Sequence, residues 1–299
     1  MSSNLFKTCT PVYEHSSANI RYENDGSNGG PPVARAAPIW YITAEGTAGV
    51  DGDRILIIKT GSTLPGLKSR KGDFENWIIA GMRVSADEVT IVDVTAGEPL
   101  PPNGSYAGVV VTGSHSMVTE HRRWSERAAQ WLALEMAVET PTLGICYGHQ
   151  LLGYALGGTV EENPMGWELG TVEIQLEEPA GRDELLGRLD STTAVKVHAS
   201  HTQSVTRLPP GAVRLASSSR DANQAFRVGK TAWGVQFHPE FDCEIVQAYI
   251  QHCRKKLIAD GQDPDQLLRE SQDTSCGGKI LQRFAKVARN SAPRGSPAK

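Results

Sequence analysis

The middle of the chain alternates between short apolar runs and longer stretches with helical spacing. Four mostly apolar runs have the length of buried strands, namely residues 54–59, 89–94, 109–112 and 141–145. Three other segments place apolar residues every three or four positions, namely 73–82, 124–138 and about 148–156. In the second of these, Trp124, Trp131 and Leu134 are expected in the core. Strands that alternate with helices predict βαβ units, and therefore a parallel sheet with helices on both faces.

The pattern changes after this alternating part. Between residues 158 and 236 it predicts short strands of period two, interrupted by Gly, Pro and Asn. One more helix is expected over 242–257, and residues 263–290 have the spacing of a terminal amphipathic helix. The predicted fold class is α/β, with a mostly parallel central sheet flanked by helices and a small antiparallel excursion.

Residues 1–52 differ in composition from the rest of the chain. Segments such as SSANIRYENDGSNGGPPVARAAP are rich in Ser, Asn, Gly and Pro and have little periodic apolar spacing. We expect a mostly disordered tail here, in which the run at 39–42 could dock on a folded surface. A start codon further along the chain is an alternative explanation. The predicted organisation is this tail, a folded domain over 53–258, and a helical extension with a basic tail over 259–299.

Composition narrows the class of protein. Hydrophobic residues make up 39% and charged residues 21% of the chain, with 30 Gly and 17 Pro, which excludes a collagen, a coiled coil and a chain disordered throughout. The formal net charge of −4 argues against a dedicated nucleic-acid-binding protein, which would carry a basic excess. No apolar run approaches the ~18 residues of a membrane span. We therefore expect neither nucleic acid nor a membrane as a partner.

The cysteines and the first residues of the chain predict its compartment. The five cysteines are scattered without C-x-x-C pairs, at positions 9, 146, 243, 253 and 276. They are typical of reduced thiols, one of which can be reactive. Acidic residues such as Glu14 and Glu23 interrupt the basic-then-apolar pattern of a secretory signal. We therefore expect a cytoplasmic protein.

The sequence G-I-C-Y-G-H-Q at 144–150 joins a predicted strand to a predicted helix. Glycines two positions to either side of a cysteine at such a junction form the thiol version of a nucleophile elbow. They allow a tight turn, while the helix N-terminus favours the Cys146 thiolate and directs the Tyr147 amide at an oxyanion. The alternative is a buried apolar role for Cys146. Chance explains the pattern poorly, because G-x-C-x-G-x-Q has odds on the order of one in a thousand in a random chain of this length.

A candidate base follows another predicted strand, in the sequence F-H-P-E at 237–240. Pro239 favours an extended conformation for His238. Because residues i and i+2 of an extended segment point the same way, Glu240 can orient the His238 imidazole and stabilise its cationic form. Alone, H-P-E would fit a surface histidine better. Downstream of a nucleophile elbow, it completes a set of nucleophile, base and orienter.

Together with T-G-S-H-S at 112–116, these sequences make residues 54–258 resemble the class I glutamine amidotransferases. The resemblance is strongest to the glutaminase domain of GMP synthase and its stand-alone relatives. It implies a flavodoxin-like fold and a catalytic triad of Cys146, His238 and Glu240.

The resemblance also implies an oxyanion hole and a substrate site. The amide of Gly113 would join that of Tyr147 in the oxyanion hole, and Gln150 would hold the amino-acid end of the substrate. These three residues lie in the motifs quoted above, so the assignment follows the resemblance position by position.

Two further segments resemble the substrate side of the family. G-W-E-L-G, which contains Gly166, Trp167 and Glu168, resembles the substrate-side loop, although an arginine or a similar residue is common where Trp167 stands. S-H-T-Q-S-V, which contains His201, resembles a segment usually written S-H-x-D-x-V, with Gln203 in place of the aspartate. The resemblance therefore implies substrate binding by Gly166, Trp167, Glu168 and His201.

Other sequence features favour structural roles. His198 and His201 are three positions apart, but no matching carboxylates or cysteines lie nearby in the sequence, so we expect no metal site. S-C-G-G-K at 275–279 lacks the spacing of a phosphate-binding loop and predicts a helix boundary. The basic residues after Thr274 favour a solvated helix face over contact with a polyanion. We also expect no cofactor.

Three functions fit these residues. The first is a glutaminase-type amidotransferase that releases ammonia from glutamine for a separate synthetase subunit or an unknown acceptor. The second is a cysteine peptidase that cleaves γ-glutamyl bonds in glutathione-like compounds. The third is a non-catalytic binding module on the same fold, against which the intact triad argues. The chain lacks the S-G-G-x-D-S loop of an ATP-pyrophosphatase domain, so we do not expect a whole GMP synthase.

Overall fold

The computed structural model describes residues 52–187, 189 and 194–291, all of which belong to one unit of the chain. The disordered tail expected over 1–52 lies outside the described residues, apart from Gly52. So does the end of the expected basic tail, from residue 292 onwards. The domain boundaries expected after 52 and 258 stay predictions.

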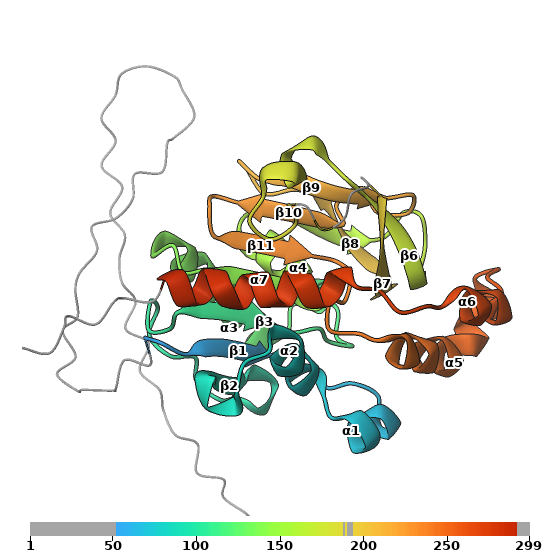
Figure 1. Cartoon of the computed structure of the whole chain (residues 1–299), viewed down its shortest axis with the longest axis horizontal. Helices are drawn as coiled ribbons and strands as arrows, with labels where there is room; N and C mark the ends of the chain where they lie inside the picture. The colour runs from blue at the N-terminus through green and yellow to red at the C-terminus, as the bar shows by residue number, and fades with distance from the viewer. Residues whose placement is uncertain (1–51, 188, 190–193, 292–299) are drawn as a thin grey trace, which may run out of the picture. The chain divides into compact units, whose positions relative to one another are not determined.

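Eleven strands lie in the described part of the chain. They are β1 (Ile55–Lys59), β2 (Val89–Asp93), β3 (Gly108–Val111), β4 (Thr142–Ile145), β5 (Thr159–Glu162), β6 (Glu168–Leu176), β7 (Ala194–His201), β8 (Gln203–Arg207), β9 (Val213–Ser218), β10 (Ala225–Val228) and β11 (Ala232–Val235). Nine of them form one sheet in the order β2–β1–β3–β4–β11–β10–β9–β6–β7, while β5 pairs with β8 (Figure 1).

The same residues contain seven α-helices. They are α1 (Pro65–Lys71), α2 (Phe74–Met82), α3 (Arg123–Ala137), α4 (Tyr147–Ala155), α5 (Cys243–Ala259), α6 (Pro264–Glu270) and α7 (Cys276–Ser291). Short 3-10 turns lie at Ala86–Glu88, Val94–Ala96, Val118–Glu120 and Glu178–Arg182. The expected N-cap of α2 is present, because the Asp73 side chain accepts from the Phe74 amide at 2.9 Å.

The large sheet has a parallel half and an antiparallel half. β2, β1, β3, β4 and β11 pair in parallel, and β10, β9, β6 and β7 continue the sheet with antiparallel pairs. The expected α/β architecture is confirmed. The antiparallel excursion is an extension of the same sheet, with only β5 and β8 forming a separate ladder in the described residues.

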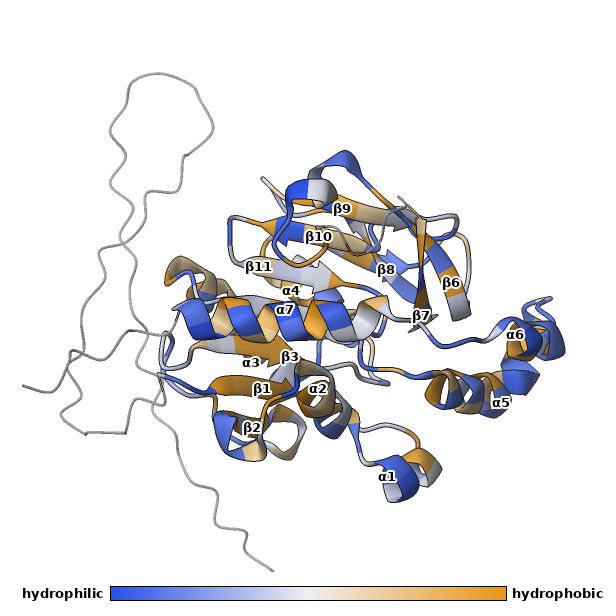
Figure 2. Cartoon of the chain, in the orientation of Figure 1, coloured by the Kyte–Doolittle hydropathy of each residue, from blue (hydrophilic) through white to orange (hydrophobic). Residues whose placement is uncertain are grey.

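Side chains of the parallel half alternate between two buried clusters. On β1, Ile55 and Ile57 pack into a cluster with residues of α2 and α7, whereas Leu56 and Ile58 pack into one with residues of α3 and α4. Figure 2 shows the apolar colour of β1. It also shows alternating apolar and polar bands along α7, which covers the face of the sheet that carries Ile55 and Ile57. Both faces of the parallel half are therefore covered, as the continuous apolar runs predicted.

The C-terminal part differs from the sequence-based expectation. The single helix expected over 263–290 is two helices, because the polar residues 271–275 favour turns and leave the helical path. α7 then begins at Cys276, where a helix boundary was predicted, and buries Leu281 and Phe284 completely. The core assignment of Leu134 is wrong, since this side chain is 61% exposed on the outer side of α3.

The strand directions bring distant segments to one edge of the sheet. β3, β4 and β11 are neighbours and run in parallel, so their carboxyl ends lie side by side. Gly113, Cys146 and His238 each follow one of these ends within three residues. This edge is where ligands bind in sheets of this kind. Among the helices that the structure describes, none has the length and apolarity to cross a membrane.

Candidate active site

Cys146 lies at the turn between β4 and α4, in a strained conformation. Its φ of 51° and ψ of −99° are uncommon for a residue that has a side chain. A Cβ on Gly144 would collide with the backbone of Gly148, and a Cβ on Gly148 would collide with the carbonyl group of Val111. The tight turn therefore needs both glycines of the motif.

His238 follows β11, and its ring is held in a fixed plane. Nδ1 lies 2.7 Å from Oε1 of Glu240, which as a carboxylate can only accept, so Nδ1 carries a proton. The ring of Phe241 stacks on the imidazole with 3.9 Å between centroids and 15° between planes. The backbone N–H of His238 donates to the carbonyl oxygen of His198 at 2.8 Å. Nε2 is then the ring nitrogen left for Cys146.

The surroundings of His238 favour its protonated form. Burial lowers the pKa of this group, but the charges of Glu240 and Cys146 and hydrogen bonds to both outweigh burial and raise the pKa to about 10. Oε2 of Glu240 is buried without a hydrogen-bond partner in the described part of the chain. The Glu240 carboxylate therefore has no competing hydrogen bond among the described residues and favours a protonated His238 beside Cys146.

The two predicted oxyanion amides lie next to the candidate nucleophile and base. Gly113 lies against the His238 ring, since a Cβ there would stand 3.0 Å from Cε1 of the imidazole. The Gly113 carbonyl oxygen accepts from the hydroxyls of Thr60 and Thr112, each at 3.1 Å. Tyr147 is the first residue of α4, so its amide has no acceptor inside the helix.

Cys146 faces a cavity of about 1150 Å³. Of the site residues expected from the sequence, Cys146, Tyr147, Gln150, Trp167 and His201 line it, as does Gln203, which stands where the family has an aspartate. Gly166 and Glu168 were expected on the substrate side but do not line this cavity. Gly166 is exposed and has a φ of 77°. Glycine adopts this conformation without strain, so Gly166 allows the turn before β6.

Gln150 presents one particular atom to a ligand. Its Nε2 donates to the carbonyl oxygen of Gln203 at 2.8 Å and to Oε1 of Gln236 at 3.0 Å. Because both amide hydrogens are directed at protein acceptors, the carbonyl oxygen is the atom that Gln150 can offer. An oxygen acceptor suits an ammonium group.

His201 is held between two acceptors. Its Nδ1 lies 2.9 Å from the carbonyl oxygen of Gln203, and its Nε2 lies 2.9 Å from Oε2 of Glu168. Both nitrogens therefore carry protons, which makes His201 an imidazolium. In agreement, burial lowers the pKa of His201, but Glu168 outweighs burial and the pKa is raised above its ordinary value. Glu168 also accepts from Ser218 at 2.7 Å and from Gln224.

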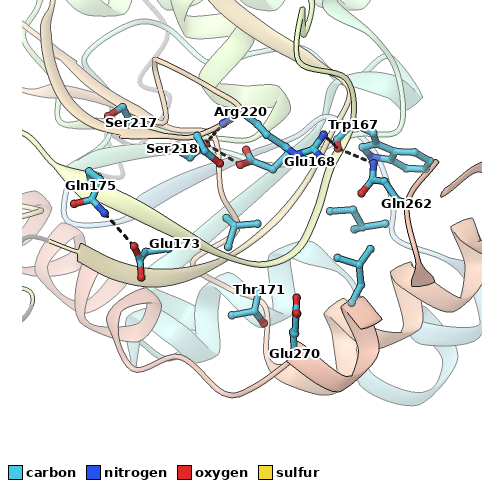
Figure 3. Close-up of a pocket in the computed structure, with 14 residues that line it drawn as sticks. Trp167, Glu168, Thr171, Glu173, Gln175, Ser217, Ser218, Arg220, Gln262 and Glu270 are labelled. Atoms are coloured by element: carbon cyan, nitrogen blue, oxygen red, sulfur yellow. Dashed lines mark hydrogen bonds between the residues drawn. The ribbon is translucent and has the colours of Figure 1, made fainter. Parts of the chain in front are cut away.

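Figure 3 shows a second, smaller cavity of about 540 Å³, which Glu168 lines and Cys146 does not. Glu168, Ser218 and Arg220 line it, and Trp167 lines both cavities. The backbone carbonyl of Trp167 accepts from Gln262 at 3.0 Å and from Arg220 at 3.3 Å. The Trp167–Glu168 segment thus separates the two cavities, and Glu168 reaches the larger one only through His201.

Several lining residues were not singled out in the sequence. Ser114, His115 and Ser116 line the larger cavity, and T-G-S-H-S was the signal that could have marked them. A second group, from Tyr249 to Asp260 on α5 and just beyond it, has no local motif. No three His, Cys, Asp or Glu side chains of the described residues are arranged to hold a metal ion.

Comparison with known proteins identifies a family. The family model described as glutamine amidotransferase class-I matches residues 71–253. A γ-glutamyl-L-1-hydroxyisopropylamide hydrolase from a Pseudomonas species is 30% identical over 171 residues, which are 54% of this chain and 56% of that protein. A glutamine-hydrolyzing GMP synthase from Acinetobacter baylyi is 34% identical over 193 residues, which are 64% of this chain and 32% of that protein.

Solved structures share the fold. A glutamine amidotransferase from Thermotoga maritima has a TM-score of 0.62 at 23% identity, covering 79% of this chain and 98% of that chain. One from Methylobacillus flagellatus has a TM-score of 0.61 at 22% identity, covering 80% of this chain and 93% of that chain. At such identities the likeness speaks for the architecture alone.

Proposed function

Because the chain belongs to the class I glutamine amidotransferase family, we propose that it is a cysteine hydrolase that cleaves the γ-amide bond of glutamine or of a γ-glutamyl compound. The observation that carries this proposal is the meeting of Cys146 with the His238–Glu240 pair at the carboxyl edge of the sheet. Each side chain alone has a structural explanation, whereas the buried constellation has the parts of a nucleophilic site.

The proposed reaction proceeds through a thioester. The Cys146 thiolate attacks the γ-carbonyl carbon, and the amides of Gly113 and Tyr147 stabilise the oxyanion that forms. The His238 imidazolium donates its proton to the departing amine as the C–N bond breaks. A water molecule, deprotonated by the same imidazole, then attacks the thioester and releases glutamate and the thiolate.

Gln150 and Trp167 are proposed to hold the amino-acid end of the substrate. The Gln150 carbonyl oxygen would accept from the α-ammonium group, because its amide hydrogens already serve protein acceptors. Trp167 lies on the wall of the same cavity, where its ring would cover the substrate's methylene groups. His201 and Glu168 are proposed to act as a fixed charge pair behind this end.

Two leaving groups are compatible with this chemistry. Ammonia would leave from glutamine and pass to a synthetase partner, as the name of the GMP synthase relative suggests. A larger amine would leave from a γ-glutamyl amide, as the name of the hydrolase relative suggests. The second is favoured by size, because about 1150 Å³ exceeds the roughly 300–1,000 Å³ of pockets for drug-sized ligands, and glutamine is smaller than those.

The test is substrate turnover by the purified chain. Wild type should release ammonia slowly from glutamine and an amine from a γ-glutamyl anilide, whereas Cys146→Ala should release neither. Cys243→Ala is the matched control, because this half-buried cysteine lies at the start of α5 and outside the cavity. Full activity in Cys146→Ala, or none in wild type with either substrate, would contradict the proposal.

A further inference from the structure

One wall of the Cys146 cavity is formed by α5 and the residue just beyond it. Tyr249, Cys253, Lys256 and Asp260 line the cavity at intervals of three and four residues, so they lie along one side of the helix. The ring hydroxyl of Tyr249 fixes this wall to the rest of the site, since it lies 3.0 Å from the Thr63 hydroxyl. The cavity thus continues from Cys146 along α5.

This wall carries positive charge. Three Lys or Arg residues and one acid line the whole cavity, and all four lie in this part of it. Arg254 is neutralised by Asp265, with which it forms two parallel hydrogen bonds of 2.8 and 2.6 Å. Lys255 and Lys256 have no carboxylate within 4.0 Å among the described residues, so their charges face solvent or a ligand.

Nearby groups respond to this charge. Burial raises the pKa of the Cys253 thiol, and the positive charge of Lys256 acts in the opposite direction. Burial lowers the pKa of His115, and His252 lowers it further. His115, Cys253 and Lys256 all line the cavity.

A lysine in the last turn of a helix also stabilises the helix through its dipole. That role does not depend on which side of the helix the lysine occupies. Lys256, however, lies on the same side as Tyr249 and Cys253, over the cavity that holds the candidate nucleophile. A helix-stabilising role therefore leaves the placement of Lys256 unexplained.

We propose that this wall is a leaving-group subsite that selects γ-glutamyl compounds whose amine half ends in a carboxylate. Lys256 binds the carboxylate, with added positive charge from Lys255. The inference rests on the proposed function, because it assigns the half of the substrate that departs from the thioester. Water is the only co-reactant: the γ-amide C–N bond breaks, the amine takes a proton, and glutamate is released.

The subsite can be tested with two substrates that differ in one charge, γ-glutamyl-alanyl-glycine and its C-terminal amide. We expect wild type to cleave the acid with about 2- to 5-fold higher kcat/KM, the range of an ion pair that is open to solvent. The preference should fall at high salt, because exposed charges are screened. Both lysines are exposed, so Lys255→Gln with Lys256→Gln should fold normally and lose the preference.

Lys286→Gln is the control, because Lys286 is an exposed lysine on α7, outside the cavity. It should keep the full preference for the acid. Equal cleavage of acid and amide by wild type would overturn the subsite and leave the proposed function standing. A preference that survives in the double variant would overturn the assignment to α5. If neither peptide nor glutamine is cleaved, the proposed function itself fails.

Discussion

The two halves of the sheet each bring a buried histidine–glutamate pair to Cys146. In the parallel half, His238 follows β11 and lies 2.7 Å from Glu240. In the antiparallel half, His201 ends β7 and lies 2.9 Å from Glu168 at the start of β6. Burial and distance are therefore nearly the same in the two pairs.

The pairs differ in what the second ring nitrogen does. His238 uses Nδ1 for Glu240 and keeps Nε2 for the thiol, so it can move a proton. His201 uses Nε2 for Glu168 and Nδ1 for the carbonyl oxygen of Gln203. Both of its N–H groups are therefore hydrogen-bonded to protein acceptors, and neither nitrogen is left to exchange a proton with Cys146. A histidine–carboxylate pair acts as a base only when one nitrogen remains open to the reacting group.

We call His238–Glu240 the open pair, because one ring nitrogen is left for the thiol, and His201–Glu168 the closed pair. The largest effect should come from a change in the open pair. His238→Gln removes the proton carrier while it keeps a polar side chain of similar length, and should lower kcat by about 10³- to 10⁴-fold. Single-turnover release of the amine from a γ-glutamyl anilide measures this loss. A decrease of less than tenfold, in a variant that unfolds at the normal temperature, would mean that another group carries the proton.

Glu240→Gln should cost less than His238→Gln, about 10²-fold in kcat. The amide still accepts from Nδ1, but the charge that raises the pKa of His238 is gone. A thiol also needs less help from a base than a hydroxyl does. The pH dependence of kcat/KM gives the readout, since the pKa assigned to the imidazolium should fall. An unchanged profile would contradict the role of Glu240.

The closed pair should affect binding and stability more than the chemical step. His201→Gln should raise KM by about tenfold and lower kcat little. It should also reduce the free energy of unfolding by about 3 kcal/mol, because Glu168 is left as a buried charge. Glu168→Gln added to His201→Gln should restore part of this stability. If His201→Gln abolished kcat as His238→Gln does, the distinction between the pairs would be wrong.

The remaining effect is on stability alone and concerns two neutral histidines nearby. Burial lowers the pKa of His149 and of His198 to about 4 in each case. Below pH 6.5, the ordinary pKa of a histidine in the unfolded chain, these residues are protonated in the unfolded state but stay neutral in the folded state. The free energy of unfolding should therefore fall by about 1.4 kcal/mol for each histidine and each pH unit of acidification. The raised pKa of His238 acts oppositely, because its contribution is present below about 6.5 and is lost as pH rises through about 10.

Denaturant unfolding at pH 5, 6.5 and 9 measures both slopes. The midpoint should be highest near pH 6.5 and should fall on either side. His198→Gln should flatten the acid side, and Glu240→Gln should flatten the alkaline side. A midpoint that stays constant between pH 5 and 6.5 would show that the two neutral histidines take up protons in the folded state.

The sequence could predict the open pair but not the closed one. Gly144, Cys146 and Gly148 lie within five positions, and His238 lies two positions from Glu240, so local geometry was enough. Glu168 meets His201 only because β6 and β7 pair in a register that sets these two residues opposite each other. That register depends on the whole antiparallel half, which no short motif describes.

The alternation of strands and helices was likewise predictable, because each element carries its own periodicity. The position of α7 was not, since an amphipathic helix shows which of its sides is buried but not which surface it covers. The prediction that Leu134 lies in the core was wrong for a related reason. It has helical spacing from Trp131, but the buried side of α3 continues through Leu132 and Glu135 instead. The contribution of α5 to the cavity could not be predicted either, because these residues form no local motif and only the fold brings them beside Cys146.

The positive φ of Cys146 sets function against thermostability at a single position. Glycine adopts a φ of 51° freely, whereas a cysteine held there costs on the order of 1–3 kcal/mol. Selection for a higher melting temperature alone would therefore favour glycine at position 146, which under the proposed function removes the nucleophile. Under the proposed function, a survey for heat-tolerant variants of this chain should therefore find that glycine at this site gives inactive proteins.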